Sequence, residues 1–131
     1  MSLKVFAIES FKQSMTKECF DSIIHDFKSY KSTGVRPDQF GRDTSYDFSQ
    51  SVADAGLRHK HVKDKSSINW HLKRLDYDRA SNTALIYCEG FFNPNEYLLL
   101  GFLRNAHETY NENRFYLLDL AAVAEEFREL Y

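Results

Sequence analysis

Two apolar runs joined by a short polar turn constrain the fold of this chain more than any other feature. Residues 84–92 (ALIYCEGFF) are apolar almost throughout, and residues 97–103 (YLLLGFL) follow after only four residues, NPNE. Asparagine and proline are typical turn residues. A strand that is buried on both faces is apolar along its length instead of alternating with polar residues. We therefore predict two neighbouring antiparallel strands near the centre of a sheet.

Other segments extend this predicted sheet. Residues 3–8 and 68–73 alternate between apolar and polar side chains, as a strand with one exposed face does. Residues 57–65 are predicted to form a strand or the loop that leads into one. Residues 76–82 are expected to be a polar turn, and residues 40–43 (FGRD) a tight turn. The result is an antiparallel sheet of about four strands.

Helices are predicted on either side of these strands. The first begins after Thr16, whose hydroxyl can cap a helix, and ends at Gly34, because glycine tolerates the left-handed conformation. A short helix is expected within residues 48–56. Residues 105–113 are predicted to be a polar loop, followed by a last helix from Tyr116 to the C-terminus with one apolar stripe.

Together these elements predict one α+β domain over residues 1–131, with helices packed on one face of the antiparallel sheet. The net charge of −2 provides no global basic field for nucleic acid. We find no apolar run of about 18 residues, so no membrane span is expected. The N-terminus does not resemble a secretion signal. We therefore expect a cytoplasmic protein in which Cys19 and Cys88 remain thiols.

Positive charge is concentrated between residues 58 and 74. This segment contains a single acidic residue, six lysines or arginines and three of the five histidines: Arg58, His59, Lys60, His61, Lys63, Lys65, His71, Lys73 and Arg74. On a strand, His59 and His61 would share one face while Lys60 points to the other.

This pattern suits metal-free RNA cleavage, which needs a base for the ribose 2′-OH, an acid for the leaving oxygen and cations for the transition state. Histidine can supply both proton transfers near neutral pH. Two alternatives remain open. The segment can be a solvated basic strand that docks on an acidic partner. It can also be a zinc site in which Asp43 or His71 joins the two histidines at 59 and 61.

Arg42 and Asp43 form a second candidate. The planar guanidinium of Arg42 can bind a phosphate, and Asp43 can orient it or position a histidine. The two can also be a structural ion pair. Tyr46 can stack on a base, or it can pack in the core.

Several of these segments carry a resemblance to a known family. The segments at 26–31 (DFKSYK), 40–43 (FGRD) and 85–90 (LIYCEG) resemble the YafO family of bacterial toxins. So do the following isolated positions and the short segment near the C-terminus: Gly34, Pro37, Asp38, Tyr46, Asp47, Leu98, Leu99, Leu103, His107 and residues 124–128 (AEEFR). Members of that family are ribosome-dependent mRNA interferases of type II toxin–antitoxin pairs, and the implied architecture is similar to that of RelE-like toxins.

The resemblance implies an endoribonuclease without a cofactor whose partners are the ribosome, mRNA and a cognate antitoxin. We predict that His59 or His61 is the acid or base and His107 the other partner, that Arg42 with Lys73 or Arg74 stabilises charge, and that Asp43 orients. The residues expected to bind RNA are Lys60, Lys63, Lys73, Arg74, Arg104 and Tyr46. Because phosphate affinity comes from Lys and Arg, a chain of net charge −2 would depend on the ribosome to present the message.

Overall fold

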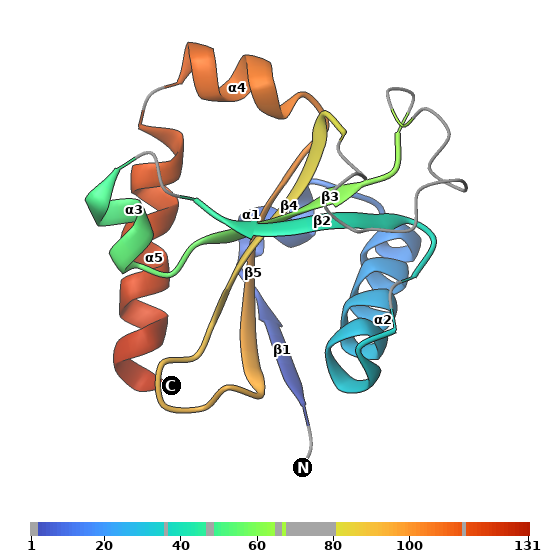
Figure 1. The fold of residues 1–131 in the computed structure, drawn as a ribbon, viewed down its shortest axis with the longest axis horizontal. Helices are drawn as coiled ribbons and strands as arrows, with labels where there is room; N and C mark the ends of the chain where they lie inside the picture. The colour runs from blue at the N-terminus through green and yellow to red at the C-terminus, as the bar shows by residue number, and fades with distance from the viewer. Residues whose placement is uncertain (1–2, 36, 47–48, 65–66, 68–80, 114) are drawn as a thin grey trace.

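Five strands form one sheet in the part of the chain that the computed structural model describes, which is residues 3–35, 37–46, 49–64, 67, 81–113 and 115–131 (Figure 1). They are β1 (Lys4–Ala7), β2 (Phe40–Ser45), β3 (Arg58–Val62), β4 (Thr83–Glu89) and β5 (Glu96–Leu103), in the spatial order β1-β5-β4-β3-β2. The pairs β5–β4, β4–β3 and β3–β2 are antiparallel, whereas β1 runs parallel to β5.

The two central strands confirm the prediction from the apolar runs, but the expectation of about four antiparallel strands needs correction. β2 is an additional strand at residues that were expected to form a tight turn. It pairs with β3, and its register shifts between Phe40 and Asp43, so the ladder is irregular there. The strand predicted at 68–73 and most of the turn predicted at 76–82 lie outside the described residues.

Five helices accompany the strands in the described ranges: α1 (Glu9–Gln13), α2 (Lys17–Thr33), α3 (Gln50–Asp54), α4 (Ala106–Glu112) and α5 (Tyr116–Leu130). Both predicted ends of α2 are confirmed. The Thr16 hydroxyl accepts a hydrogen bond from the Cys19 N–H, and Gly34 has φ of 74°. α4 replaces the predicted polar loop. Its first turn is held by the Asn82 side chain, which accepts a hydrogen bond from the His107 N–H at 2.9 Å.

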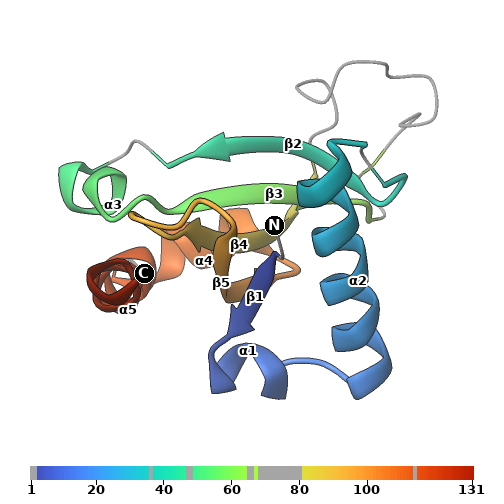
Figure 2. The same ribbon diagram turned by 90° about the horizontal axis from the view of Figure 1, so that it is seen from below.

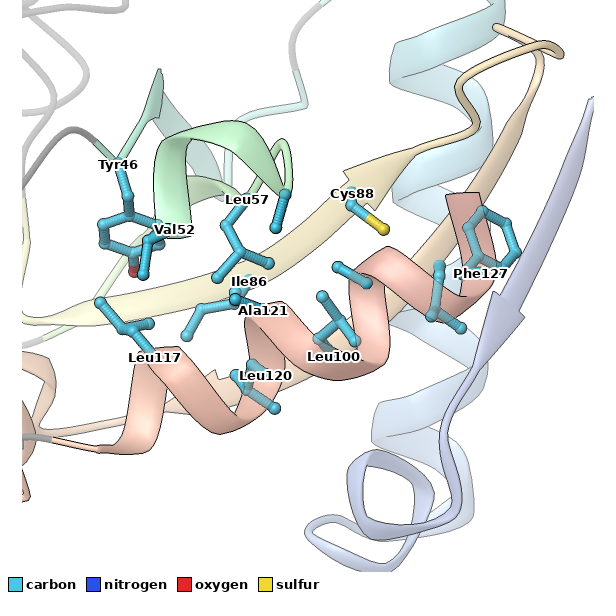
Figure 3. Close-up of a cluster of buried hydrophobic side chains, with 13 residues drawn as sticks. Tyr46, Val52, Leu57, Ile86, Cys88, Leu100, Leu117, Leu120, Ala121 and Phe127 are labelled. Atoms are coloured by element: carbon cyan, nitrogen blue, oxygen red, sulfur yellow. The ribbon is translucent and has the colours of Figure 1, made fainter. Parts of the chain in front are cut away.

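Helices cover both faces of the sheet, which corrects the expectation of a single covered face (Figure 2). α1 and α2 pack on one face, where their side chains meet Leu85 and Tyr87 of β4. α3 and α5 pack on the other, against Ile86 and Cys88 of the same strand (Figure 3). Because successive side chains of β4 point to opposite covered faces, its residues from Thr83 to Cys88 are all buried, without alternation between buried and exposed.

Both cysteines are free thiols, as expected, and burial raises the pKa of the Cys88 thiol to about 12. Among the helices in the described ranges, none combines the length and apolarity needed to cross a membrane.

Candidate active site

A pocket of about 820 Å³ opens on the face of the sheet that also carries α5. Its walls come from β2, β3, the start of β4, α4 and the first turn of α5. Four of the predicted catalytic residues line it, namely Arg42, His59, His61 and His107. The pocket therefore brings together groups from three separate parts of the sequence.

Strand pairing explains why these side chains converge. Thr44 of β2 lies opposite His59 of β3 in the antiparallel ladder, so their side chains share a face. Residues two apart on a strand also share a face. Accordingly Arg42 lines the pocket with Thr44, and His61 lines it with His59. The prediction that the two strand histidines face the same side is confirmed.

His59 is enclosed on several sides. Its ring stacks on Tyr46 at a centroid distance of 4.1 Å, and its Nε2 lies 3.3 Å from the Thr44 hydroxyl. Its Nδ1 is buried without a hydrogen-bond partner among the described residues. Burial, and then the nearby charge of His61, lower the pKa of His59 to about 4. The imidazole is therefore neutral at pH 7.

His61 is anchored through one ring nitrogen. Its Nδ1 lies 2.8 Å from the Ser81 carbonyl oxygen and 2.9 Å from the Ser81 backbone nitrogen. This pair of contacts fits either tautomer, because Nδ1 can donate to the carbonyl or accept from the N–H. Burial lowers the pKa of His61, and the charges of Arg42 and His107 lower it further. The other ring nitrogen, Nε2, takes no part in these contacts with Ser81.

His107 approaches the pocket from α4. It is exposed and occupies the first turn of the helix, where Asn82 holds its backbone N–H. Its charge is one of the causes that lower the pKa of His61, and both residues line the pocket. The pocket thus combines a half-buried neutral imidazole with an exposed one.

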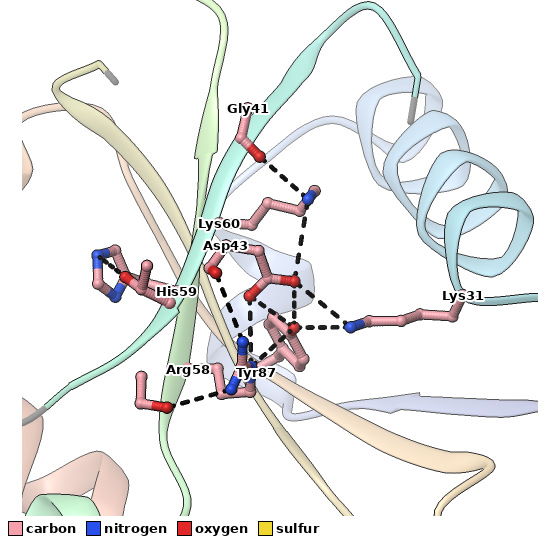
Figure 4. Close-up of polar contacts among 9 residues, drawn as sticks. Lys31, Gly41, Asp43, Arg58, His59, Lys60 and Tyr87 are labelled. Atoms are coloured by element: carbon pink, nitrogen blue, oxygen red, sulfur yellow. Dashed lines mark hydrogen bonds and ion pairs between the residues drawn. The ribbon is translucent and has the colours of Figure 1, made fainter. Parts of the chain in front are cut away.

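Asp43 lies on the opposite face of the sheet, which corrects the expectation that it orients Arg42 or a histidine (Figure 4). Its carboxylate accepts hydrogen bonds from the Tyr87 hydroxyl at 2.7 and 2.9 Å, and it faces the cations of Lys31, Arg58 and Lys60. The reason is the alternation of side chains along β2, since Arg42 and Asp43 are neighbours in the sequence.

Lys60 is also displaced from its expected role. The side chain is fully buried, and its ammonium donates to the Gly41 carbonyl at 3.1 Å and lies 3.7 Å from the centre of the Tyr30 ring. RNA therefore cannot reach it in this structure. Its burial follows from the same alternation that turns His59 and His61 toward the pocket.

Tyr46 lines the pocket but is only 7% exposed, and it belongs to the core cluster beside α5. One ring face stacks on His59, and its hydroxyl is hydrogen-bonded to that of Tyr110. The alternative of core packing is therefore the correct one for this residue, in place of stacking on a base.

Two further predicted RNA contacts fall among the described residues, Lys63 and Arg104. Lys63 is exposed just after β3, and Arg104 is exposed after β5 with its guanidinium 5.9 Å from the centre of the Phe102 ring. Neither lines the pocket. Lys73 and Arg74 lie outside the described residues, as does His71.

Among the pocket residues that sequence reasoning missed, two contact the strand histidines 59 and 61. Thr44, which contacts His59, would have been found if β2 had been recognised as a strand, because it is two residues from Arg42. Ser81, which anchors His61 through its backbone, has no sequence signal, since any residue offers the same N–H and C=O groups.

The zinc alternative finds no support in the described ranges. No group there of three or more His, Cys, Asp or Glu side chains is arranged to hold a metal ion. Asp43 cannot join His59 and His61, because it lies on the other face of the sheet.

Comparison with known proteins now places the chain in a family. A family model described as "Toxin YafO, type II toxin-antitoxin system" matches residues 28–129. The chain is also 30% identical to the mRNA interferase toxin YafO of Escherichia coli (strain K12), over 96% of this chain and 98% of that protein. No solved structure matches, so the RelE-like architecture stays a prediction. The chain belongs to the YafO family of toxins from type II toxin–antitoxin systems.

Proposed function

We propose that this protein is an endoribonuclease that cleaves mRNA at the ribosome, inhibits translation and is neutralised by a cognate antitoxin. The relative from Escherichia coli is named as an mRNA interferase toxin. The observation that carries the proposal is the pocket in which Arg42, His61 and His107 meet, since together they supply the groups that RNA cleavage needs.

In the proposed reaction His61 is the general base. With Nδ1–H donating to the Ser81 carbonyl, Nε2 carries the lone pair that removes the proton from the ribose 2′-OH. The freed 2′ oxygen attacks the adjacent phosphorus, and the bond from phosphorus to the 5′ oxygen breaks. Because burial keeps the imidazole neutral before the reaction, Nε2 is ready to accept a proton at pH 7.

His107 is the general acid and Arg42 the stabiliser of charge. The exposed position of His107 at the rim allows its imidazolium to give a proton to the leaving 5′ oxygen. The guanidinium of Arg42 offers a planar pair of donors to the phosphate oxygens, where negative charge builds up in the transition state. The products are a 2′,3′-cyclic phosphate and a 5′-hydroxyl. No step of this route requires a metal ion.

His59 has a supporting role in this scheme. Its ring is held between Tyr46 and Thr44, and its pKa of about 4 makes it a weaker base than an ordinary histidine. We assign it to shaping the wall of the pocket beside His61, with which its ring makes an edge-to-face contact at 5.5 Å.

Non-catalytic docking through the basic strand is the competing function. The structure weakens its premise, because β3 lies between β2 and β4 and Lys60 is fully buried. A strand in that position presents little basic surface to an acidic partner. Cleavage is therefore the function that the geometry supports best.

The proposal is tested by incubating the purified protein with translating ribosomes and mapping new 5′ ends on the message. We expect new ends carrying a 5′-hydroxyl with the wild type and with His25→Gln, which changes an exposed histidine of α2 far from the pocket in sequence. The variant with His59, His61 and His107 all replaced by glutamine is expected to produce none. If that variant still arrests growth, docking replaces cleavage as the function.

A further inference from the structure

A second cavity, of about 330 Å³, lies on the other side of β2 from the histidine pocket. Three basic residues border it, Lys31, Arg42 and Arg58, of which Arg42 also lines the histidine pocket, and Asp43 and Glu89 are among the other lining residues. The volume is several times that of a water molecule, which takes about 30 Å³ in the liquid. The cavity is therefore large enough for a small polar group.

The charges around Asp43 do not balance. Its carboxylate is 3.4 Å from the Lys31 ammonium, 3.4 Å from Arg58 Nε and 3.9 Å from the Lys60 ammonium. One carboxylate thus faces three cations, one of which is fully buried. A single cation would satisfy a structural ion pair, and each further buried cation adds repulsion and a cost of desolvation. Glu89, which also lines the cavity, offsets only part of this excess.

The nearby aromatic rings also favour cations here. The Lys31 ammonium donates to the Tyr87 hydroxyl at 2.8 Å and lies 4.8 Å from the centre of that ring. Lys31 is held in place by these contacts, and its side chain is still 17% exposed and lines the cavity. A positioned, partly exposed cation beside excess positive charge is suited to bind an anion from solvent.

The two cavities share a wall. Arg42 and Thr44 line both of them, and β2 is the last strand of the sheet within the described part of the chain. A flexible, negatively charged chain that crosses β2 can therefore place one phosphate beside the histidines and a neighbouring phosphate beside Lys31. Single-stranded RNA has that regular spacing of charge.

We propose that the cavity lined by Lys31, Arg42 and Arg58 is a second phosphate subsite, which holds a phosphodiester adjacent to the one that is cleaved. This inference rests on the proposed function, because it assumes that RNA occupies the histidine pocket. It adds a positioning contact that holds the message across β2, with Asp43 keeping Lys31 and Arg58 aimed at the cavity.

The test uses two non-cleavable probes, a 2′-O-methyl dinucleotide with one phosphodiester and a 2′-O-methyl trinucleotide with two. Binding is followed by NMR titration, which measures weak affinities. In the wild type, we expect the trinucleotide to bind roughly fivefold more tightly or better, as one charge-assisted contact provides, and to shift the Arg58 Nε–H resonance.

Lys31→Met keeps the length and apolar contacts of the side chain and removes its charge. The gain in affinity of the trinucleotide over the dinucleotide should therefore disappear. Lys31→Arg should restore it. Lys17→Met removes an exposed lysine from the same helix and should leave the gain unchanged. A thermal melt of each variant confirms that it is folded.

Three results would overturn the inference. One is an equal gain in Lys31→Met and the wild type. Another is trinucleotide binding that shifts His61 and leaves Arg58 unmoved. The third is a glutamate-rich peptide that binds at Arg58 more tightly than the trinucleotide, which would make the cavity a site for an acidic protein. None of these results affects the cleavage assay on ribosomes, so the proposed function stands or fails separately.

Discussion

The Nδ1 atom of His61 lies within hydrogen-bond distance of both the carbonyl oxygen and the backbone nitrogen of Ser81, at 2.8 and 2.9 Å. Nδ1–H can donate to the carbonyl oxygen in the neutral tautomer that has its lone pair on Nε2. The same hydrogen bond is kept when the ring gains a proton on Nε2. A residue outside regular structure thus fixes the ring of a β3 side chain through one of its two nitrogens.

The electrostatic link between His61 and His107 provides the first prediction. Burial lowers the pKa of His61, and the charge of His107 lowers it further. Replacing His107 by glutamine removes one of these causes, so the pKa of His61 should rise toward its ordinary value. An NMR titration of the histidine ring protons measures this. His25→Gln is the matched control and should leave the pKa of His61 unchanged.

The second prediction concerns stability at low pH. The pKa of His59 is about 4 in the folded protein against 6.5 for a free histidine, so the unfolded chain binds more protons between these values. The free energy of unfolding should therefore fall as the pH drops from about 6.5 toward 4, by up to about 1.4 kcal/mol per pH unit from this residue. At higher pH this contribution is fully present.

Urea unfolding at several pH values measures how steeply the free energy of unfolding changes with pH and tests whether His59 causes this slope. His59→Phe retains an aromatic ring against Tyr46 and cannot titrate, so part of the slope should be lost. His25→Gln should keep the full slope. An unchanged slope in His59→Phe would show that His59 does not cause the acid sensitivity.

The third prediction contrasts a buried ion cluster with an exposed ion pair. Asp43→Asn leaves Lys31, Arg58 and Lys60 without their carboxylate, and breaking a buried pair typically costs about 3–5 kcal/mol. Asp21→Asn removes a surface partner of Lys17, which should cost at most about 0.5 kcal/mol. Urea unfolding at pH 7 compares the two variants. Similar small decreases in the free energy of unfolding of both would contradict the structural role of Asp43.

The parts of the fold that were predicted correctly are those with a local signal. The runs that became β4 and β5 are apolar because both faces of these strands are covered. The caps of α2, Thr16 and Gly34, form hydrogen bonds with residues only three or four positions away in the sequence. The shared face of His59 and His61 follows from strand geometry alone.

The parts that were missed depend on residues distant in the sequence. β2 has no apolar alternation, because its Asp43 is buried by Tyr87 and by cations from α2 and β3. α4 lacks an apolar stripe, and its first turn is held by the side chain of Asn82, which precedes β4. The burial of Lys60 likewise requires Tyr30 and Gly41. Composition and spacing within one segment carry no information about such partners.

The central claim is that Arg42, His61 and His107 form one cleavage site. Its most direct test is the single-turnover rate at which the protein cleaves ribosome-bound message. We predict that His61→Gln and His107→Gln each lower this rate by about 100-fold or more, as loss of a general acid or base does, while His25→Gln retains the wild-type rate. Rates for His61→Gln and His107→Gln that match the wild type, in folded protein, would contradict the account.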